Sequence, residues 1–131
     1  MRKDLDLKLD ERLLDKEPKE IVDEAERYAK RCSNISNSRL RKIFDCVSDL
    51  HSLCKEKKDR REIEYKLQEL RILIAYLANR EKGDKKNLLL NLENLVKNVD
   101  LHKAPNELKV VSKLYLFFEA LIAFHKDKNK R

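Results

Sequence analysis

Apolar residues recur every three or four positions in five successive segments of the chain, which is the spacing of one face of an α-helix. The pattern predicts helices over about residues 18–32, 38–55, 59–80, 84–99 and 105–126. Pro18 and Pro105 stand at the start of the first and last segments, where a missing backbone N–H is tolerated. Gly83 follows the third segment and is expected to end that helix. We therefore predict an all-α fold, a compact bundle of about five helices in a single domain.

Each segment has an apolar stripe that is expected to face the core. The stripes of the first three segments are Ile21, Ala25, Tyr28 and Ala29; Leu40, Ile43, Val47 and Leu50; and Ile63, Leu67, Leu70, Ile74 and Leu77. The stripes of the last two are Leu88, Leu92, Leu95 and Val96; and Val111, Leu114, Phe118 and Leu121. A chain of this size can bury roughly two-thirds of its unfolded surface, enough for one core.

Two segments carry more apolar surface than one core contact requires. The third has a second stripe, nearly opposite the first, made of Tyr65, Ile72 and Tyr76. A helix that is apolar on two sides is either central or shared with a partner, so we predict self-association through these residues, for example as a homodimer. In the last segment Phe117 and Phe124 widen the apolar arc to roughly half the circumference, which predicts a core helix or an assembly surface.

The ends of the chain lie outside the five segments. Residues 1–16 alternate charges with leucines and are expected to form a mobile arm or a short helix, residues 17–126 the bundle domain, and residues 127–131 a basic tail. No apolar run approaches the length of a signal sequence or a membrane span. The three cysteines show no C-x-x-C spacing and suit reduced thiols. We therefore expect a cytoplasmic protein that does not associate with membranes.

The chain is basic, with 31 Lys and Arg against 24 Asp and Glu and a formal net charge of +7. A positive surplus favours polyanionic partners, although the acids are interspersed, so only a local patch could bind strongly. Arg39, Arg41 and Lys42 cluster beside the polar stretch 33–37, which offers further groups to a phosphate. A solvated face explains any one such cluster equally well. Tyr76, near Arg80, is a candidate for stacking on a base, although packing is the commoner role.

The sequence contains few of the residue patterns that catalysis or cofactor binding requires. A single glycine excludes the glycine-rich loops that cradle phosphates. His51 and Cys54, three residues apart on one helix, could share a metal ion, but the spacing of the further ligands that a site needs is absent. Cysteines in apolar stripes have raised rather than lowered thiol pKa values. We expect no enzyme activity, no cofactor and no metal.

Three segments carry a resemblance to a known family. They are Asn-Ser-Arg-Leu-Arg-Lys-Ile-Phe at 37–44, Leu-Ile-Ala-Tyr-Leu-Ala-Asn-Arg at 73–80, and Phe-Phe-Glu-Ala-Leu-Ile-Ala-Phe-His-Lys at 117–126. In this order and spacing they resemble the small subunit of type III-A CRISPR effector complexes, the Csm interference complexes. The last segment is the most specific, because it looks very like the C-terminal signature of that family.

The resemblance implies a non-catalytic helical subunit that stacks along the inside of a ribonucleoprotein filament in more than one copy. Its implied partners are guide RNA, target RNA, the other Csm subunits and itself. Arg41 and Lys42 are the implied first RNA contacts and Arg80 the next, while Lys126 would touch RNA or a neighbouring subunit. Arg39 completes the predicted RNA-binding set, although an uncharged, Gln-like residue is commoner there. His125 is expected to pack or to form a helix-end hydrogen bond.

One other hypothesis stays open beside this one. The chain could be a self-associating helical adaptor that uses Tyr65, Ile72 and Tyr76 and never binds nucleic acid. Its basic runs would then only increase solubility.

Overall fold

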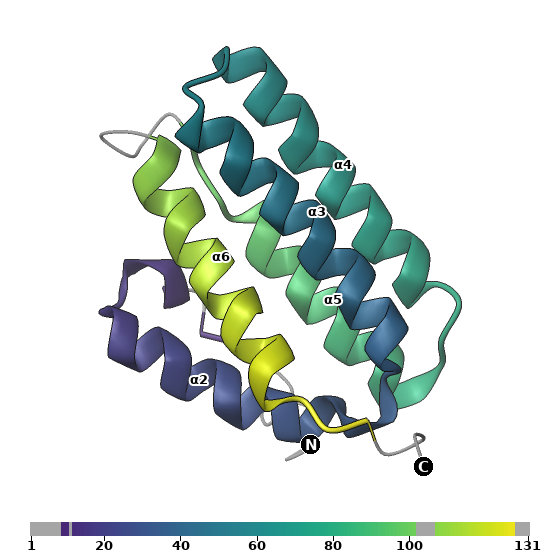
Figure 1. Cartoon of the computed structure of the whole chain (residues 1–131). Coiled ribbons are helices and arrows are strands. Elements are labelled where there is room, and N and C mark those ends of the chain that lie inside the picture. The colour runs from purple at the N-terminus through teal and green to yellow at the C-terminus, as the bar shows by residue number, and fades with distance from the viewer. Residues whose placement is uncertain (1–8, 11, 102–106, 128–131) are drawn as a thin grey trace.

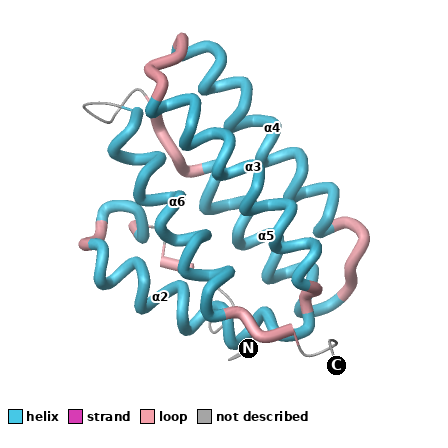
Figure 2. The backbone as a smooth tube through the Cα atoms, in the orientation of Figure 1, coloured by secondary structure: helices cyan, strands magenta, loops and turns pink. Residues whose placement is uncertain are grey.

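The residues that the computed structural model describes, 9–10, 12–101 and 107–127, form five α-helices (Figure 1). These are α2 (Pro18–Arg31), α3 (Asn37–Lys55), α4 (Arg60–Ala78), α5 (Gly83–Lys97) and α6 (Glu107–Phe124). Two short 3-10 turns, η1 (Leu13–Asp15) and η2 (Cys32–Asn34), flank α2. Figure 2 shows helices and loops and no strand in this part of the chain. The predicted all-α bundle is confirmed; Pro105 and residues 128–131 lie outside the described residues.

Helix α6 is a central element of the bundle. It packs against both α2 and α3, while α4 packs against both α3 and α5. Phe117 and Phe118 of α6 are buried and meet edge to face, with ring centroids 5.4 Å apart, and Tyr28 of α2 lies 6.4 Å from Phe117. The two neighbouring helices therefore explain most of the wide apolar arc of α6. The core prediction is confirmed for Phe117, whereas Phe124, the last residue of the helix, is 41% exposed.

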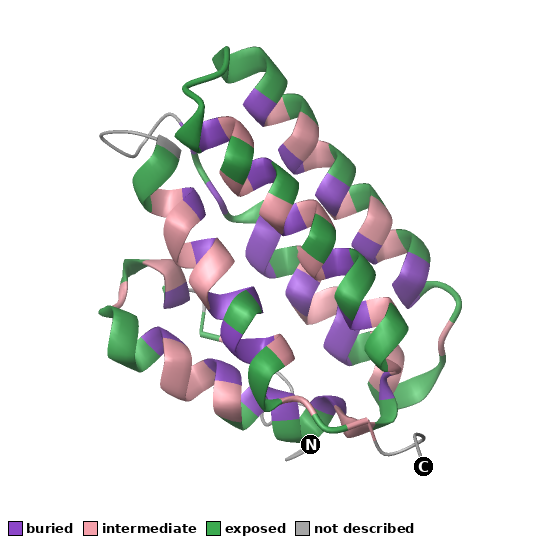
Figure 3. Ribbon diagram, in the orientation of Figure 1, coloured by how far each residue is buried: buried purple, intermediate pink, exposed green. Residues whose placement is uncertain are grey.

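The predicted core stripes are buried. Figure 3 shows the inward faces of the helices in the buried class, whereas much of the outer face of α4 is exposed. Leu13, Ile35 and Leu101, which lie outside the α-helices, are also buried, with at most 1% of their surface exposed. The Tyr28 hydroxyl, deep in this core, donates a hydrogen bond of 2.7 Å to the Leu88 carbonyl and so joins α2 to α5. Among the described helices, none is both long and apolar enough to span a membrane.

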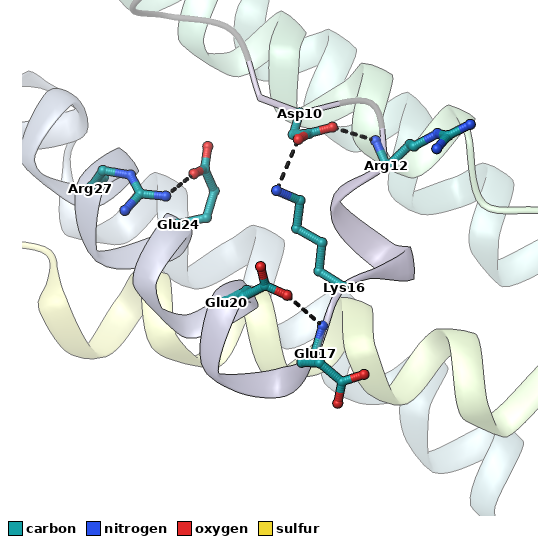
Figure 4. Close-up of polar contacts among 7 residues, drawn as sticks. All are labelled: Asp10, Arg12, Lys16, Glu17, Glu20, Glu24 and Arg27. Carbon is teal, nitrogen blue, oxygen red and sulfur yellow. Dashed lines mark hydrogen bonds and ion pairs between the residues drawn. The ribbon is translucent and has the colours of Figure 1, made fainter.

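Local polar contacts fix the start of α2 (Figure 4). The backbone N–H of Glu17 donates to the Glu20 carboxylate at 3.2 Å. Just before the helix, Asp10 accepts from the Arg12 backbone N–H at 2.8 Å and pairs with Lys16 at 3.0 Å. The last part of the predicted arm thus contains the short helical turn η1 (Leu13–Asp15), and residues 1–8 and 11 lie outside the described part.

Gly83 does not end α4, contrary to the sequence prediction. Helix α4 ends at Ala78 with Asn79 as its cap, and Gly83 is the first residue of α5. Its φ is 63°, in the left-handed region that residues with a Cβ rarely adopt. The glycine therefore allows the chain to reverse direction between α4 and α5, and it does not cap the end of α4.

Candidate nucleic-acid interface

One end of the bundle carries a surplus of positive charge. The end of α2, the start of α3, the α4–α5 connector and the end of α6 all lie toward the lower end in Figure 1. Their segments, residues 30–42, 78–86 and 124–127, hold ten Lys and Arg and three Asp and Glu, while the rest of the sequence holds twenty-one of each. We call these three segments the basic end. Its surplus equals the formal net charge of +7 of the whole chain.

Two residues that follow α6, His125 and Asp127, form hydrogen bonds with residues at the start of α3 and just before it. The His125 Nε2 donates to the Cys32 carbonyl at 2.9 Å, and its Nδ1 lies 2.9 Å from the Asn37 side-chain oxygen. The Asp127 carboxylate accepts from the Asn37 backbone N–H at 2.9 Å. The predicted helix-end hydrogen bond of His125 is confirmed. Lys126 lies between His125 and Asp127 in the sequence and is exposed.

The start of α3 uses its backbone donors internally. The Ser36 hydroxyl accepts from the Arg39 N–H at 3.3 Å, and Asp127 already takes the N–H of Asn37. The first turn of a helix binds phosphate through such N–H groups when they are free. The polar stretch 33–37 therefore contributes less to an anion site than its composition indicated, and the side chains of α3 remain as the candidates.

Arg39 is committed to an ion pair. Its guanidinium lies 3.1 Å from the Glu81 carboxylate, and Lys85 approaches the same carboxylate at 3.9 Å. Such partly exposed pairs contribute at most about 1 kcal/mol, so this contact joins the start of α3 to the α4–α5 connector without fixing the fold. Of the five predicted RNA contacts, Arg39 is the one to which another described residue supplies an ion-pair partner.

Arg41 and Lys42 are exposed on the first turns of α3. Neither forms an ion pair with another described residue. Helices α3 and α4 pack against each other, and the charge of Lys42 helps to lower the pKa of the Tyr76 hydroxyl on α4. The two cations that the family resemblance put first therefore have no ion-pair partner among the described residues, as is also true of Arg80 and Lys126.

Arg80 and Tyr76 form a contact pair at the end of α4. The Arg80 guanidinium carbon lies 4.3 Å from the centre of the Tyr76 ring, within the range of a cation–π contact. A hydrogen bond and the charge of Arg80, with the charge of Lys42, lower the pKa of the Tyr76 hydroxyl. The sequence assigned Tyr76 to self-association and Arg80 to RNA, with Tyr76 near Arg80 as a candidate for stacking on a base, and the structure places these two side chains in contact.

The rest of the second stripe of α4 is open. Tyr65 is 72% exposed and Ile72 68% exposed, and Tyr76, at 55%, continues the same face. Two such large apolar side chains on one helix face, away from the core, are a candidate contact for another protein.

The side chains of His51 and Cys32, which could in principle be reactive, pack within the bundle. His51 lies between α3 and α6, where its Nε2 is 3.1 Å from the Ser112 hydroxyl and its ring stacks on Tyr115 with centroids 4.3 Å apart. Burial lowers the pKa of His51 and raises that of the Cys32 thiol to about 12. Within the described ranges, no group of three His, Cys, Asp or Glu is placed to hold a metal ion.

Comparison with known proteins adds one match. No curated protein and no solved structure matches the chain significantly. A family model described as Csm2 Type III-A matches residues 15–131, which span all five helices and the three segments of the resemblance. The chain therefore belongs to the Csm2 family, the small structural subunits of the type III-A CRISPR Csm complex.

Proposed function

We propose that this chain is a non-catalytic, RNA-contacting subunit that stacks along the cytoplasmic type III-A filament and helps to hold the guide–target RNA. The observation that carries the proposal is the basic end, which holds the whole positive surplus of the sequence. A local cation patch is what a phosphate backbone requires. Its neighbours in the filament would be the other Csm subunits and further copies of itself.

Within the basic end, the proposed contacts differ in kind. Arg41, Lys42 and Arg80 are exposed and would contact phosphates directly. Lys126 would contact phosphates from the segment that follows α6, which Asp127 joins to the start of α3. Arg39, paired with Glu81, would add to RNA binding mainly by holding α3 and the connector in place. Contacts of this type read no sequence, which suits a system where base pairing to a guide does the reading.

We propose a non-catalytic role on the basis of the pKa values of two cysteine thiols. A nucleophilic cysteine needs a lowered pKa, whereas burial raises the pKa of both Cys32 and Cys46. A structural role requires only that the helices hold the cations in place.

The test is charge reversal at the basic end in the assembled complex. The variant R41E/K42E should bind single-stranded target RNA more weakly, and its log–log salt slope should be shallower by about 1.4, that is about 0.7 for each phosphate lost. The matched control is K58E/R61E, which makes the same charge change at two exposed residues of the α3–α4 connector and the start of α4. Equal RNA affinities and slopes for both variants would contradict the proposal.

A second role is favoured by the exposure of Tyr65 and Ile72. We propose that these residues, with Tyr76 at the edge, form the surface through which copies of the chain associate. Sedimentation velocity should show a concentration-dependent dimer or larger oligomer for the wild type and a monomer for Y65S/I72S. If the oligomer persists in that variant, the association surface lies elsewhere. The adaptor hypothesis would gain if association is lost in Y65S/I72S while R41E/K42E leaves all RNA binding unchanged.

A further inference from the structure

Tyr76 differs from the other exposed tyrosine of α4 in its surroundings. Both Tyr65 and Tyr76 lie on the outer face, and both are more than half exposed. Tyr76, however, carries Arg80 over its ring at 4.3 Å and lies within reach of the charge of Lys42. Tyr65, close to three turns earlier on α4, has no comparable ring contact among the described residues.

The arrangement around Tyr76 matches the chemistry of a nucleotide. A base offers a flat π-face, and the phosphates on either side of it offer negative charge. The structure sets a partly exposed aromatic ring beneath the guanidinium of Arg80, from the turn after α4, and the charge of Lys42, from α3, acts on the hydroxyl of the same ring. The contact with Arg80 also restrains the ring, so less conformational entropy is lost when a base stacks on it.

We propose that the Tyr76 ring is a stacking platform for a base of single-stranded RNA, with Lys42 and Arg80 holding the phosphates beside it. The inference rests on the proposed RNA contact and adds the base to it. Every base has a π-face, so stacking tolerates any sequence, as a guided complex requires. Charge favours a polyanion over an apolar protein surface at the Tyr76 end of the stripe, because Tyr76 borders the basic end.

The first experiment separates stacking from charge. Binding of a fluorescein-labelled oligoadenylate RNA and of an abasic chain of equal length is measured at low salt for the full-length wild type, Y76A, Y76F and L108A. Y76A should weaken oligoadenylate binding roughly tenfold and abasic binding much less. Y76F, which keeps the ring, and L108A, a control that removes an exposed apolar side chain of α6, should bind both ligands as the wild type does. Circular dichroism checks that each variant is folded.

A fluorescence measurement locates the base directly. The chain has no tryptophan, so Y76W and Y65W each introduce a single reporter. Oligoadenylate should quench the fluorescence of Y76W strongly and that of Y65W weakly, and the abasic chain should quench neither.

The outcomes separate this inference from the proposed function. If both ligands bind the wild type equally well, Y76A affects both alike and Y76W is not quenched, then phosphate contact stands and base stacking is refuted. If neither ligand binds the wild type or the assembled complex, the proposed RNA contact and the stacking site both fail. A selective loss of oligoadenylate binding in Y76A, with quenching of Y76W, would establish the site.

Discussion

Lys57 occupies a backbone conformation that suits glycine, and this predicts the outcome of a simple substitution series. Helix α3 ends in a Schellman motif, in which the Lys57 N–H donates to the Cys54 carbonyl and the Lys58 N–H to the Leu53 carbonyl, each at 3.1 Å. Lys57 takes the position that needs a left-handed conformation, with φ at 56°. Glycine is the usual residue there because it has no Cβ to clash with the backbone.

The expected magnitude follows from three opposing effects. The left-handed conformation costs a residue with a Cβ about 1–2 kcal/mol, and glycine avoids that cost. Glycine in turn loses about 0.5–1 kcal/mol more backbone entropy on folding than alanine does. Replacing Lys57 also removes a favourable charge near a helix C-terminus, worth about 0.3–1 kcal/mol, but K57A and K57G share that loss. K57G should therefore be more stable than K57A by about 0.5–1 kcal/mol.

The assay is urea unfolding of K57A and K57G, followed by far-ultraviolet circular dichroism, together with thermal unfolding. The difference in Tm should be about 2–5 °C. The neighbouring pair K58A and K58G is the control, because φ of Lys58 is not positive. There the order should reverse, since glycine brings only its entropic cost. If K57A is as stable as K57G, the left-handed conformation at the end of α3 is refuted.

Three further predictions concern Gly83, the thiols and His51. G83A should lower the free energy of unfolding by about 1 kcal/mol, because φ is 63° and nothing lies within 4 Å of the added Cβ, so the cost lies in the backbone; an unchanged urea midpoint would contradict this. A thiol reagent at pH 8 should modify Cys46, which is only half-buried, well before Cys32, whose pKa is raised to about 12; peptide mass spectrometry reads the order, and equal rates would count against it. The pKa of His51 is lowered by burial, so its stabilising effect is present above its ordinary pKa and is lost as pH falls through the folded value. The wild type should therefore lose more stability than H51Q between about pH 7 and pH 5, and parallel losses in urea unfolding would refute the assignment.

Periodicity could predict the helices and the core because a helix that buries one face must repeat its apolar residues with the helical period. Leu40 and Ile43 show this, since both lie on the predicted stripe and both are buried. Leu13 and Ile35 are buried as well, but each lies in a short turn with no period to reveal it. Gly83 was misassigned because a left-handed glycine serves both helix ends and tight reversals, and sequence alone does not separate the two.

The candidate site was harder to predict, because its contacts depend on which helix ends meet. The family resemblance pointed to Arg41 and Lys42, and the structure leaves both of them exposed. Sequence patterns do not show that Arg39 pairs with Glu81, or that Asp127, ninety positions along the chain from Asn37, caps α3. The contact of Arg80 with Tyr76 follows from helical spacing, but the approach of Lys42 from another helix does not.

The charge distribution is the strongest link between fold and function. Around the start of α2 the charges are paired, as between Asp10 and Lys16 and between Glu24 and Arg27 (Figure 4). Such pairs stabilise the fold. The positive surplus at the basic end does not stabilise it, because like charges repel one another there. Exposed cations such as Arg41 and Lys42, which have no ion-pair partner among the described residues, are therefore best explained by a polyanion that neutralises them on binding. The salt dependence of RNA binding tests this explanation directly, because release of counterions from each phosphate sets its slope.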